Sequence, residues 1–438
     1  MPNIQAKASQ ASPNQLASVA VVGDKFFVTA VAAAPDNAPF FTQNVFPFLL
    51  VGQISTSSKV ATISLGDAIE DQVAAGATRN FMADLYDIAP VSDSILYLLG
   101  RGADAVQRVA LAGTNVDLGA AGVKQIDLLG AGGDPANPQC QNPIGIVARH
   151  DSNNLFVDCW VSRATVNISV ETQKVVARVA AAPIADSEKD VNKGRRDYFT
   201  ARARWSKEVW SSCASCHPDG LSDNITWSFP SGPRQSTSMD GTFSHGSGTQ
   251  KQRILNWTGI FDEIHDFERN TRTVSGGLGA VTTGDCSSLA GEVRLNLNPN
   301  KVGVVPPAVD DLNGLNTTLL KPVKEVQDGI GSPKSCVTDF DSIENFVKTI
   351  RPPQKPRTLN AASVSNGRTV FEAGNCQNCH GGAGWTVSRR FFTPSTDGNT
   401  KLASDDLVTP LPGHTKMIEN EQNPAGGSVG PNQVACVL

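Results

Sequence analysis

The chain is poor in aromatic and charged residues, and it has no long apolar run. Aromatic residues make up 6% of its 438 residues and charged residues 18%, and the formal net charge is −5. Lysine and arginine form no cluster, so the sequence does not favour a nucleic-acid partner. No segment approaches the roughly 18 apolar residues of a membrane-spanning helix, so no membrane span is expected. With 40% hydrophobic residues, 39 glycines and 26 prolines, the composition predicts a globular, loop-rich protein of two or three domains.

Helical periodicity is also missing from residues 16–183, where short apolar runs alternate with clusters of turn residues. A weak repeat is visible there. The segments 92–111 and 151–170 share a turn, an apolar strand, a polar loop and a second strand, and 23–30 opens a third copy. Repeats of roughly 40–50 residues are typical of β-propeller blades, and this length admits about four. We therefore predict an all-β, propeller-like N-terminal region, with a β-sandwich as the alternative.

Two Cys-x-x-Cys-His motifs contain four of the nine cysteines: Cys213, Cys216 and His217 in the first, and Cys376, Cys379 and His380 in the second. Two thiols three residues apart on a helical turn can each form a thioether with the same porphyrin, and the adjacent histidine can then bind the iron. The motifs therefore predict two covalently bound haem c groups. The alternatives are a zinc ion held by four thiolates, which leaves both histidines over, and a redox disulfide.

The second axial ligand decides what each iron does. A methionine or a second histidine gives a low-spin electron carrier, whereas an open position permits chemistry on a small molecule. We select His265 as the candidate ligand, because the neighbouring carboxylates Asp262, Glu263, Asp266 and Glu268 can orient its imidazole. The same carboxylates are compatible with a protonated surface histidine. The other candidates are Met239 and His245 after the first motif, and His414 and Met417 after the second.

Helix-compatible sequence begins after residue 183. The charged segment 185–210 leads to the first motif and 361–375 to the second. Each contains a glycine and an aromatic residue four positions apart, which places both on one helix face; the pairs are Gly194 with Tyr198 and Gly367 with Phe371. A further helix is predicted at 340–351. Its capping residues are Asp341 and Glu344, its stop is Pro352–Pro353, and its apolar face holds Phe340, Ile343, Phe346, Val347 and Ile350.

The two motif-bearing segments resemble small class I cytochromes c, in which the glycine–aromatic pair marks the close crossing of the first and last helices. On that resemblance, 340–351 is the last helix of a first unit, and the second unit lacks its closing helix. The stretch 151–179 resembles one repeat of YVTN-type propellers. We therefore expect three domains: 1–184, incomplete propeller-like repeats; 185–357, a cytochrome c unit with a long insertion; and 358–438, a second cytochrome c unit truncated at its C-terminus. The cytochrome c region is expected to be mainly α-helical and rich in loops.

Two such units in tandem resemble the bacterial dihaem cytochrome c peroxidase superfamily. The stretch 232–243 is similar to that family's Arg-Asn-Ser/Thr-Pro-Ser/Thr-Leu segment, with Thr237 at the proline position, and 253–263 is similar to its Phe-Trp-Asp-Gly-Arg segment. The resemblance implies that Trp257 lies between the haems and that Glu263 or Glu268 is an acid/base group for peroxide cleavage. Packing of Trp257 beside a haem is the alternative.

Five further cysteines need a role. In an oxidising compartment Cys140 can pair with Cys159 and Cys286 with Cys336, and free buried thiols are the alternative. Cys436 is left over, and we expect its partner to lie beyond the C-terminus. The chain also opens without a charged segment followed by an apolar one. We therefore expect a periplasmic or extracellular protein whose export signal is missing, through processing or because the chain is a fragment.

Three functions follow from these features. The first is electron transfer in an extracytoplasmic redox chain, with a soluble or membrane-bound redox protein as partner. The second is a dihaem peroxidase- or oxygenase-type enzyme, in which one high-spin haem reacts with a small-molecule oxidant such as peroxide. In the third, the β-region binds a substrate from which the cytochrome part collects electrons.

Overall fold

The computed structural model describes residues 10–37, 39, 41–74, 79–113, 115–130, 139–149, 153–203, 205–229, 232–243, 264–267, 270–271, 274–277, 282–283, 293–294, 338–352 and 358–376. By its contacts the chain groups into two units, Met1–Ser236 with Asn270–Gly279, and Thr237–Arg269 with Ala280–Leu438. The predicted domain boundaries at 184 and 357 follow sequence pattern and stay predictions. No helix among the described residues is long and apolar enough to cross a membrane.

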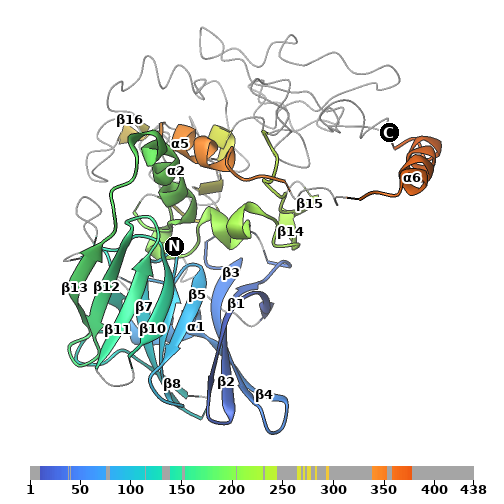
Figure 1. Ribbon diagram of the computed structural model, residues 1–438. Helices are drawn as coiled ribbons and strands as arrows, with labels where there is room; N and C mark the ends of the chain where they lie inside the picture. Colours follow the sequence, from blue (N-terminus) through green and yellow to red (C-terminus); the bar gives the residue numbers. More distant parts are fainter. Residues whose placement is uncertain are drawn as a thin grey trace. The chain divides into compact units, whose positions relative to one another are not determined.

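Three consecutive antiparallel sheets form the first part of the chain (Figure 1), and in each the strands pair in chain order. The first sheet contains β1 (Ser12–Val22), β2 (Lys25–Ala33), β3 (Val45–Gln53) and β4 (Ser58–Ser64). The second contains β5 (Leu85–Pro90), β6 (Ile95–Gly100), β7 (Ala105–Ala112) and β8 (Asn115–Leu118), with the short β9 (Ile126–Asp127) beside β7. The third contains β10 (Pro143–Ala148), β11 (Asn154–Cys159), β12 (Ala164–Ser169) and β13 (Lys174–Ala180).

The sequence repeat corresponds to equivalent strands of these sheets. Its three copies open on β2, β6 and β11, each the second strand of its sheet. The all-β prediction is therefore confirmed, and the described residues form three sheets where the length admitted about four. One helix, α1 (Leu65–Gln72), interrupts the region against expectation. Ser64 caps this helix, because its hydroxyl accepts the Asp67 N–H. The helix is only two turns long, so its apolar residues show no clear helical period in the sequence.

The sheets are arranged like propeller blades and not like the two layers of a sandwich. Strand β5 contacts both β1 and β10, so the first strands of the three sheets lie side by side. Asp87 of β5 joins them, because its carboxylate accepts the Ser18 hydroxyl at 2.7 Å and the Ile146 N–H at 2.8 Å. Strand β6 is buried on both faces. Its alternating side chains divide between two cores, Leu96 and Leu98 in one and Tyr97 and Leu99 in the other.

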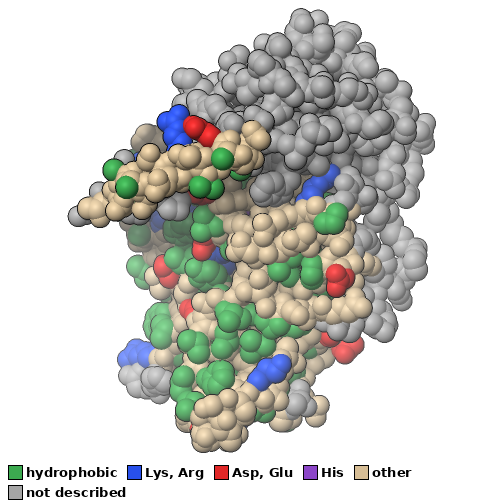
Figure 2. All heavy atoms as spheres, turned by 90° about the vertical axis from the view of Figure 1, so that its right-hand side faces the viewer, with side chains coloured by type: hydrophobic (Ala, Val, Ile, Leu, Met, Phe, Trp, Pro, Cys, Tyr) green, Lys and Arg blue, Asp and Glu red, His purple; other side chains and the backbone are tan. Residues whose placement is uncertain are grey.

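The first sheet also exposes apolar side chains. Figure 2 shows such side chains in green on the face turned towards the β1–β4 side of the molecule. The large exposed ones of this sheet and its turns are Leu16, Val19, Val21, Ile54 and Val60. The described residues therefore leave this part of the sheet uncovered.

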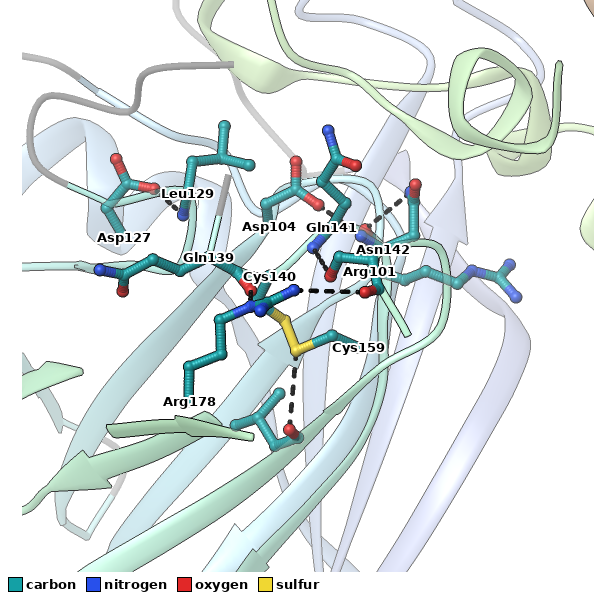
Figure 3. Close-up of a disulfide and its surroundings, with 12 residues drawn as sticks. Arg101, Asp104, Asp127, Leu129, Gln139, Cys140, Gln141, Asn142, Cys159 and Arg178 are labelled. Atoms are coloured by element: carbon teal, nitrogen blue, oxygen red, sulfur yellow. Dashed lines mark hydrogen bonds between the residues drawn. A yellow bond between two sulfur atoms is a disulfide. The ribbon is translucent and has the colours of Figure 1, made fainter. Parts of the chain in front are cut away.

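A disulfide joins Cys140 to Cys159 at the end of β11, with an S–S distance of 2.01 Å (Figure 3). Both residues are fully buried, and Arg178 of β13 donates to the Gln139 carbonyl beside the bond. The predicted pairing of these two cysteines is confirmed. Cys286, Cys336 and Cys436 lie outside the described residues.

The helix-compatible segment 185–210 is helical only in its first half. A 3-10 turn, η3 (Asp186–Glu188), leads into α2 (Lys189–Phe199), and Thr200 is extended. The chain leaves the helix because Ala201 N–H donates to Gly102 O at 2.9 Å and the Arg202 guanidinium donates to Ala103 O. The β6–β7 loop thus offers this segment better partners than another helical turn.

The remaining elements are short. After α2 come η4 (Lys207–Val209), η5 (Cys213–Ser215), η6 (Pro218–Gly220), and the hairpin of β14 (Thr226–Phe229) and β15 (Gly232–Gln235). The other unit contains η8 (Ile264–Phe267), β16 (Thr282–Thr283), β17 (Val293–Arg294), α5 (Thr338–Val347) and α6 (Ala361–Ala373).

Helix α5 confirms the helix predicted near 340–351. The apolar face is buried at Phe340, Ile343, Phe346 and Val347. The helix begins at Thr338, two residues before the predicted range, so Asp341 and Glu344 lie inside it, and it ends at Val347, four residues before the predicted end. Helix ends are the least certain part of a sequence-based prediction, since alternative capping residues are often only a few positions apart.

Candidate haem-attachment site

The first Cys-x-x-Cys-His motif forms a single helical turn. His217 N–H donates to Cys213 O at 2.9 Å, and Cys216 N–H donates to the same carbonyl at 3.3 Å. Cys213, Cys216 and His217 are each partly exposed, and the two cysteines are not bonded to each other. The structure therefore places Cys213, Cys216 and His217 on one turn.

A serine box closes this turn. The Ser212 hydroxyl accepts Ala214 N–H at 3.0 Å, while the Ser212 N–H donates to the Ser215 hydroxyl at 2.9 Å. Two backbone donors at the start of the turn are thus paired. Both serines are buried, so the box is shielded from water.

Asp84 of the β-region lies against the serine box. Its carboxylate accepts a hydrogen bond from Ser212 Oγ and another from Ser215 Oγ, the latter at 2.5 Å. The side chain is buried just before β5. Burial raises the pKa of Asp84 above its usual value, and the nearby Arg101 charge and the two serine hydroxyls oppose that rise.

Tyr198 of α2 holds the other end of the turn. Its hydroxyl donates to His217 O at 2.7 Å. Tyr198 and Gly194 are both buried, as expected for residues on one face of this helix. Burial raises the pKa of Tyr198 well above its usual value, so the phenol remains a hydrogen-bond donor at neutral pH. The backbone that carries the His217 imidazole is therefore fixed from α2.

Trp210 anchors the segment in front of the motif. Its ring packs edge-on against Phe46 at 5.3 Å and Phe81 at 4.8 Å between ring centroids, and its indole N–H donates to Asn44 Oδ1 at 2.9 Å. Trp210 is buried in the core of the first sheet. A buried aromatic residue with a satisfied N–H fixes the chain strongly at this point.

The β6–β7 loop adds two ion pairs, one to the exposed Asp219 and one made by the buried Asp104. Arg101 donates to Asp219 Oδ1 at 2.8 Å and lies over the rings of Tyr86 and Phe199 at 4.3 and 4.5 Å. Figure 3 shows Arg101 and Asp104 of this loop near the disulfide, and Asp104 also binds the guanidinium of Arg196 in α2 at 2.9 and 2.5 Å. One loop of the β-region therefore contacts both α2 and the segment that follows His217.

The protonation of the thiols bears on the redox-disulfide alternative. Burial raises the pKa of Cys213 to about 12 and that of Cys216 well above its usual value, and the Asp84 carboxylate adds to both shifts. A thioredoxin-type motif needs the opposite, a lowered thiol pKa that yields a reactive thiolate. The surroundings of these cysteines therefore disfavour a redox disulfide.

The second motif is described only at its start. Cys376 follows α6, is exposed, and donates its N–H to Phe371 O at 3.1 Å. An added Cβ at Gly367 would meet nothing within 4 Å, so no described helix packs against this glycine. Cys379 and His380 lie outside the described residues.

The axial-ligand and catalytic candidates stay predictions. Met239 is partly exposed and belongs to the unit that does not contain His217, and its carbonyl accepts Thr242 N–H. His265 lies in η8, and its side chain is outside the described part of the structure. The remaining candidates, also outside it, are Trp257, Glu263, Glu268, His245, His414 and Met417. Where the structure describes side chains, no three His, Cys, Asp or Glu residues gather into a metal site.

Known proteins offer little guidance. No protein-family profile and no curated protein sequence matches the chain. One solved structure that matches is hydrazine synthase of Kuenenia stuttgartiensis, with 13% identity and a TM-score of 0.25 over 42% of this chain and 40% of that chain. Another is the β-propeller domain of the Trilobed protease from Pyrococcus furiosus, with 7% identity and a TM-score of 0.24 over 40% of this chain and 45% of that chain. The chain thus spans less than half the length of either match. Likenesses this slight carry no argument about function.

Proposed function

We propose that the chain is a c-type cytochrome with two covalently bound haem c groups that transfers electrons outside the cytoplasm. The observation that carries the proposal is the turn at the first motif, where Cys213, Cys216 and His217 share five consecutive residues and each residue is partly exposed. Haem, when bound, supplies an iron that cycles between two oxidation states.

The residues of this turn fit a haem. Cys213 and Cys216 would form the thioethers, and His217 would bind the iron. Tyr198 supports the arrangement by holding the His217 carbonyl, and the serine box fixes the backbone on either side of Cys213. A ligand held on a fixed backbone needs less reorganisation when its metal changes charge. At the second motif, Cys376, Cys379 and His380 would play the same roles.

The chemistry of the cysteines supports the proposed compartment. The Cys140–Cys159 disulfide is buried in the third sheet, and such bonds persist mainly in oxidising compartments. This supports a periplasmic or extracellular location. A soluble or membrane-bound redox protein would then donate or accept the electrons.

Spin state decides between electron transfer and peroxidase-type chemistry. The full chain, matured with haem in a bacterial periplasm, is examined by electron paramagnetic resonance before and after addition of peroxide or cyanide. An electron carrier shows two low-spin signals that neither reagent changes, because both axial positions are filled. A high-spin signal that reacts with peroxide would replace this proposal with a dihaem peroxidase-type enzyme, for which His265, Trp257, Glu263 and Glu268 are the residues to test.

A further inference from the structure

We propose that Asp84 is a positioning residue for haem attachment at the first motif, an inference that rests on the proposed function. Asp84 belongs to the β-region, far from the motif in sequence. Its buried carboxylate nevertheless binds the hydroxyls of Ser212 and Ser215, which stand on either side of Cys213. No other described carboxylate binds either hydroxyl.

The carboxylate sets the direction of both hydroxyls. A serine hydroxyl has one hydrogen, and here Ser212 and Ser215 each donate it to Asp84. Their lone pairs are then left to accept backbone N–H groups, from Ala214 to Ser212 and from Ser212 to Ser215. With Asp84 in place, each hydroxyl of the serine box both donates and accepts a hydrogen bond, and a fully satisfied buried network is rigid. The turn that presents the two thiols is thus formed by protein contacts alone.

The β6–β7 loop fixes Asp84 in turn. Arg101 N–H donates to Asp84 O at 2.9 Å, and Asp84 has a positive φ of 52°. A Cβ added to Gly102 would lie 2.8 Å from Asp84 Oδ2 and 3.1 Å from Phe199 O. Glycine at 102 therefore allows the loop to close over the carboxylate. Through Asp84, the β-region shapes the attachment turn.

A general loss of stability must be separated from a loss of positioning. Asp87 provides a matched control, because it lies three residues further along and its carboxylate also accepts a serine hydroxyl and a backbone N–H, from Ser18 and Ile146. These partners belong to β1 and β10 and not to the motif. Asp87→Asn should weaken the β-region without disturbing the serine box.

The test compares the wild-type full chain with Asp84→Ala and Asp87→Asn in two measurements. In the haem-free chain, hydrogen exchange is followed at the Ser212 and Ala214 amides. We expect Asp84→Ala to speed exchange at these two amides by roughly tenfold or more, the factor for losing a hydrogen bond to a charged group. In Asp87→Asn, exchange at the same amides should change no more than exchange at amides that open only when the whole chain unfolds. In the matured chain, mass spectrometry of proteolytic peptides gives haem occupancy at each motif. We expect Asp84→Ala to lower it at the first motif only.

Wild-type exchange and wild-type occupancy in Asp84→Ala would overturn the inference. If Asp84→Ala does not fold, Ser215→Ala removes one of the same hydrogen bonds and must show the same pattern. If the wild-type chain itself carries no haem, the proposed function fails, whereas the exchange measurement still decides whether Asp84 shapes the turn.

Discussion

At the residue scale, the turn around Cys213 is held by side chains and not by a long helix. Asp84 orders the serine box at its start, and Tyr198 holds the His217 carbonyl at its end. Gln15 of β1 adds a hydrogen bond to Ser215 O at 2.6 Å. The imidazole of His217 therefore projects from a backbone whose position is set on both sides.

Replacing His217 by alanine tests its proposed role directly. The thioethers do not involve the imidazole, so haem should stay attached at the first motif while its spin state and potential change. Absorption and electron paramagnetic resonance spectra measure both. His380→Ala is the matched variant and should alter only the second haem. A spectrum unaltered by His217→Ala would contradict the axial role.

The residues of the motif could be found from sequence, but its supports could not. Thioether attachment of a haem would require a fixed spacing, and five consecutive letters of the sequence show that Cys213, Cys216 and His217 have it. The role of Tyr198 was indicated only weakly by the sequence, through its position four residues after Gly194 on the same helix face. Asp84 had no such indication, since an aspartate before a strand is an ordinary turn residue and its contact with the motif arises only from tertiary folding.

At the element scale, sequence predicted strands better than helix ends. The second strands of the three sheets repeat as apolar runs because each contributes side chains to a core: β6 is buried on both faces, and β11 buries every second residue. Helix α2 ends early for a reason that lies outside its own sequence, since the β6–β7 loop pairs with Ala201. The short helix α1 escaped prediction because two turns give no clear period.

The disulfide should contribute measurably to the stability of the third sheet. It closes a loop between residues 19 apart, for which the chain-entropy argument gives about 3 kcal/mol. Cys140→Ala with Cys159→Ala should lower the free energy of unfolding by about that amount in urea titrations. Reductant provides the control, because it should remove the difference in stability between the wild-type chain and the double variant. Equal stability of both chains would show that the bond is dispensable.

The turn between β1 and β2 should make stability depend on acid pH. Asp24 accepts hydrogen bonds from the Ser55 hydroxyl, the Gln53 amide and Ser55 N–H, which lower its pKa below 3.8. Because the folded-state pKa is lowered, this contribution is present above the unfolded value and is lost as pH falls through the folded one. The stability difference between wild type and Asp24→Asn should therefore be constant near neutral pH and shrink as pH falls below about 5, most of all below the unfolded-state pKa. A difference independent of pH would contradict this account of Asp24.

At the scale of the whole molecule, the proposal joins an all-β region to two haem-attachment motifs in one chain. The first motif and the three sheets belong to the same compact unit, so they are neighbours in the fold as well as in the sequence. The contacts of Asp84, Trp210 and the β6–β7 loop show how the β-region supports that motif.

Covalent haem attachment is the central claim, and the intact mass of the matured chain tests it most directly. After extraction with acid acetone, which removes haem that is not covalently bound, the mass should exceed the polypeptide mass by two haems. Proteolytic peptides should place one haem on Cys213 and Cys216 and the other on Cys376 and Cys379. A colourless chain with the bare polypeptide mass would contradict the account.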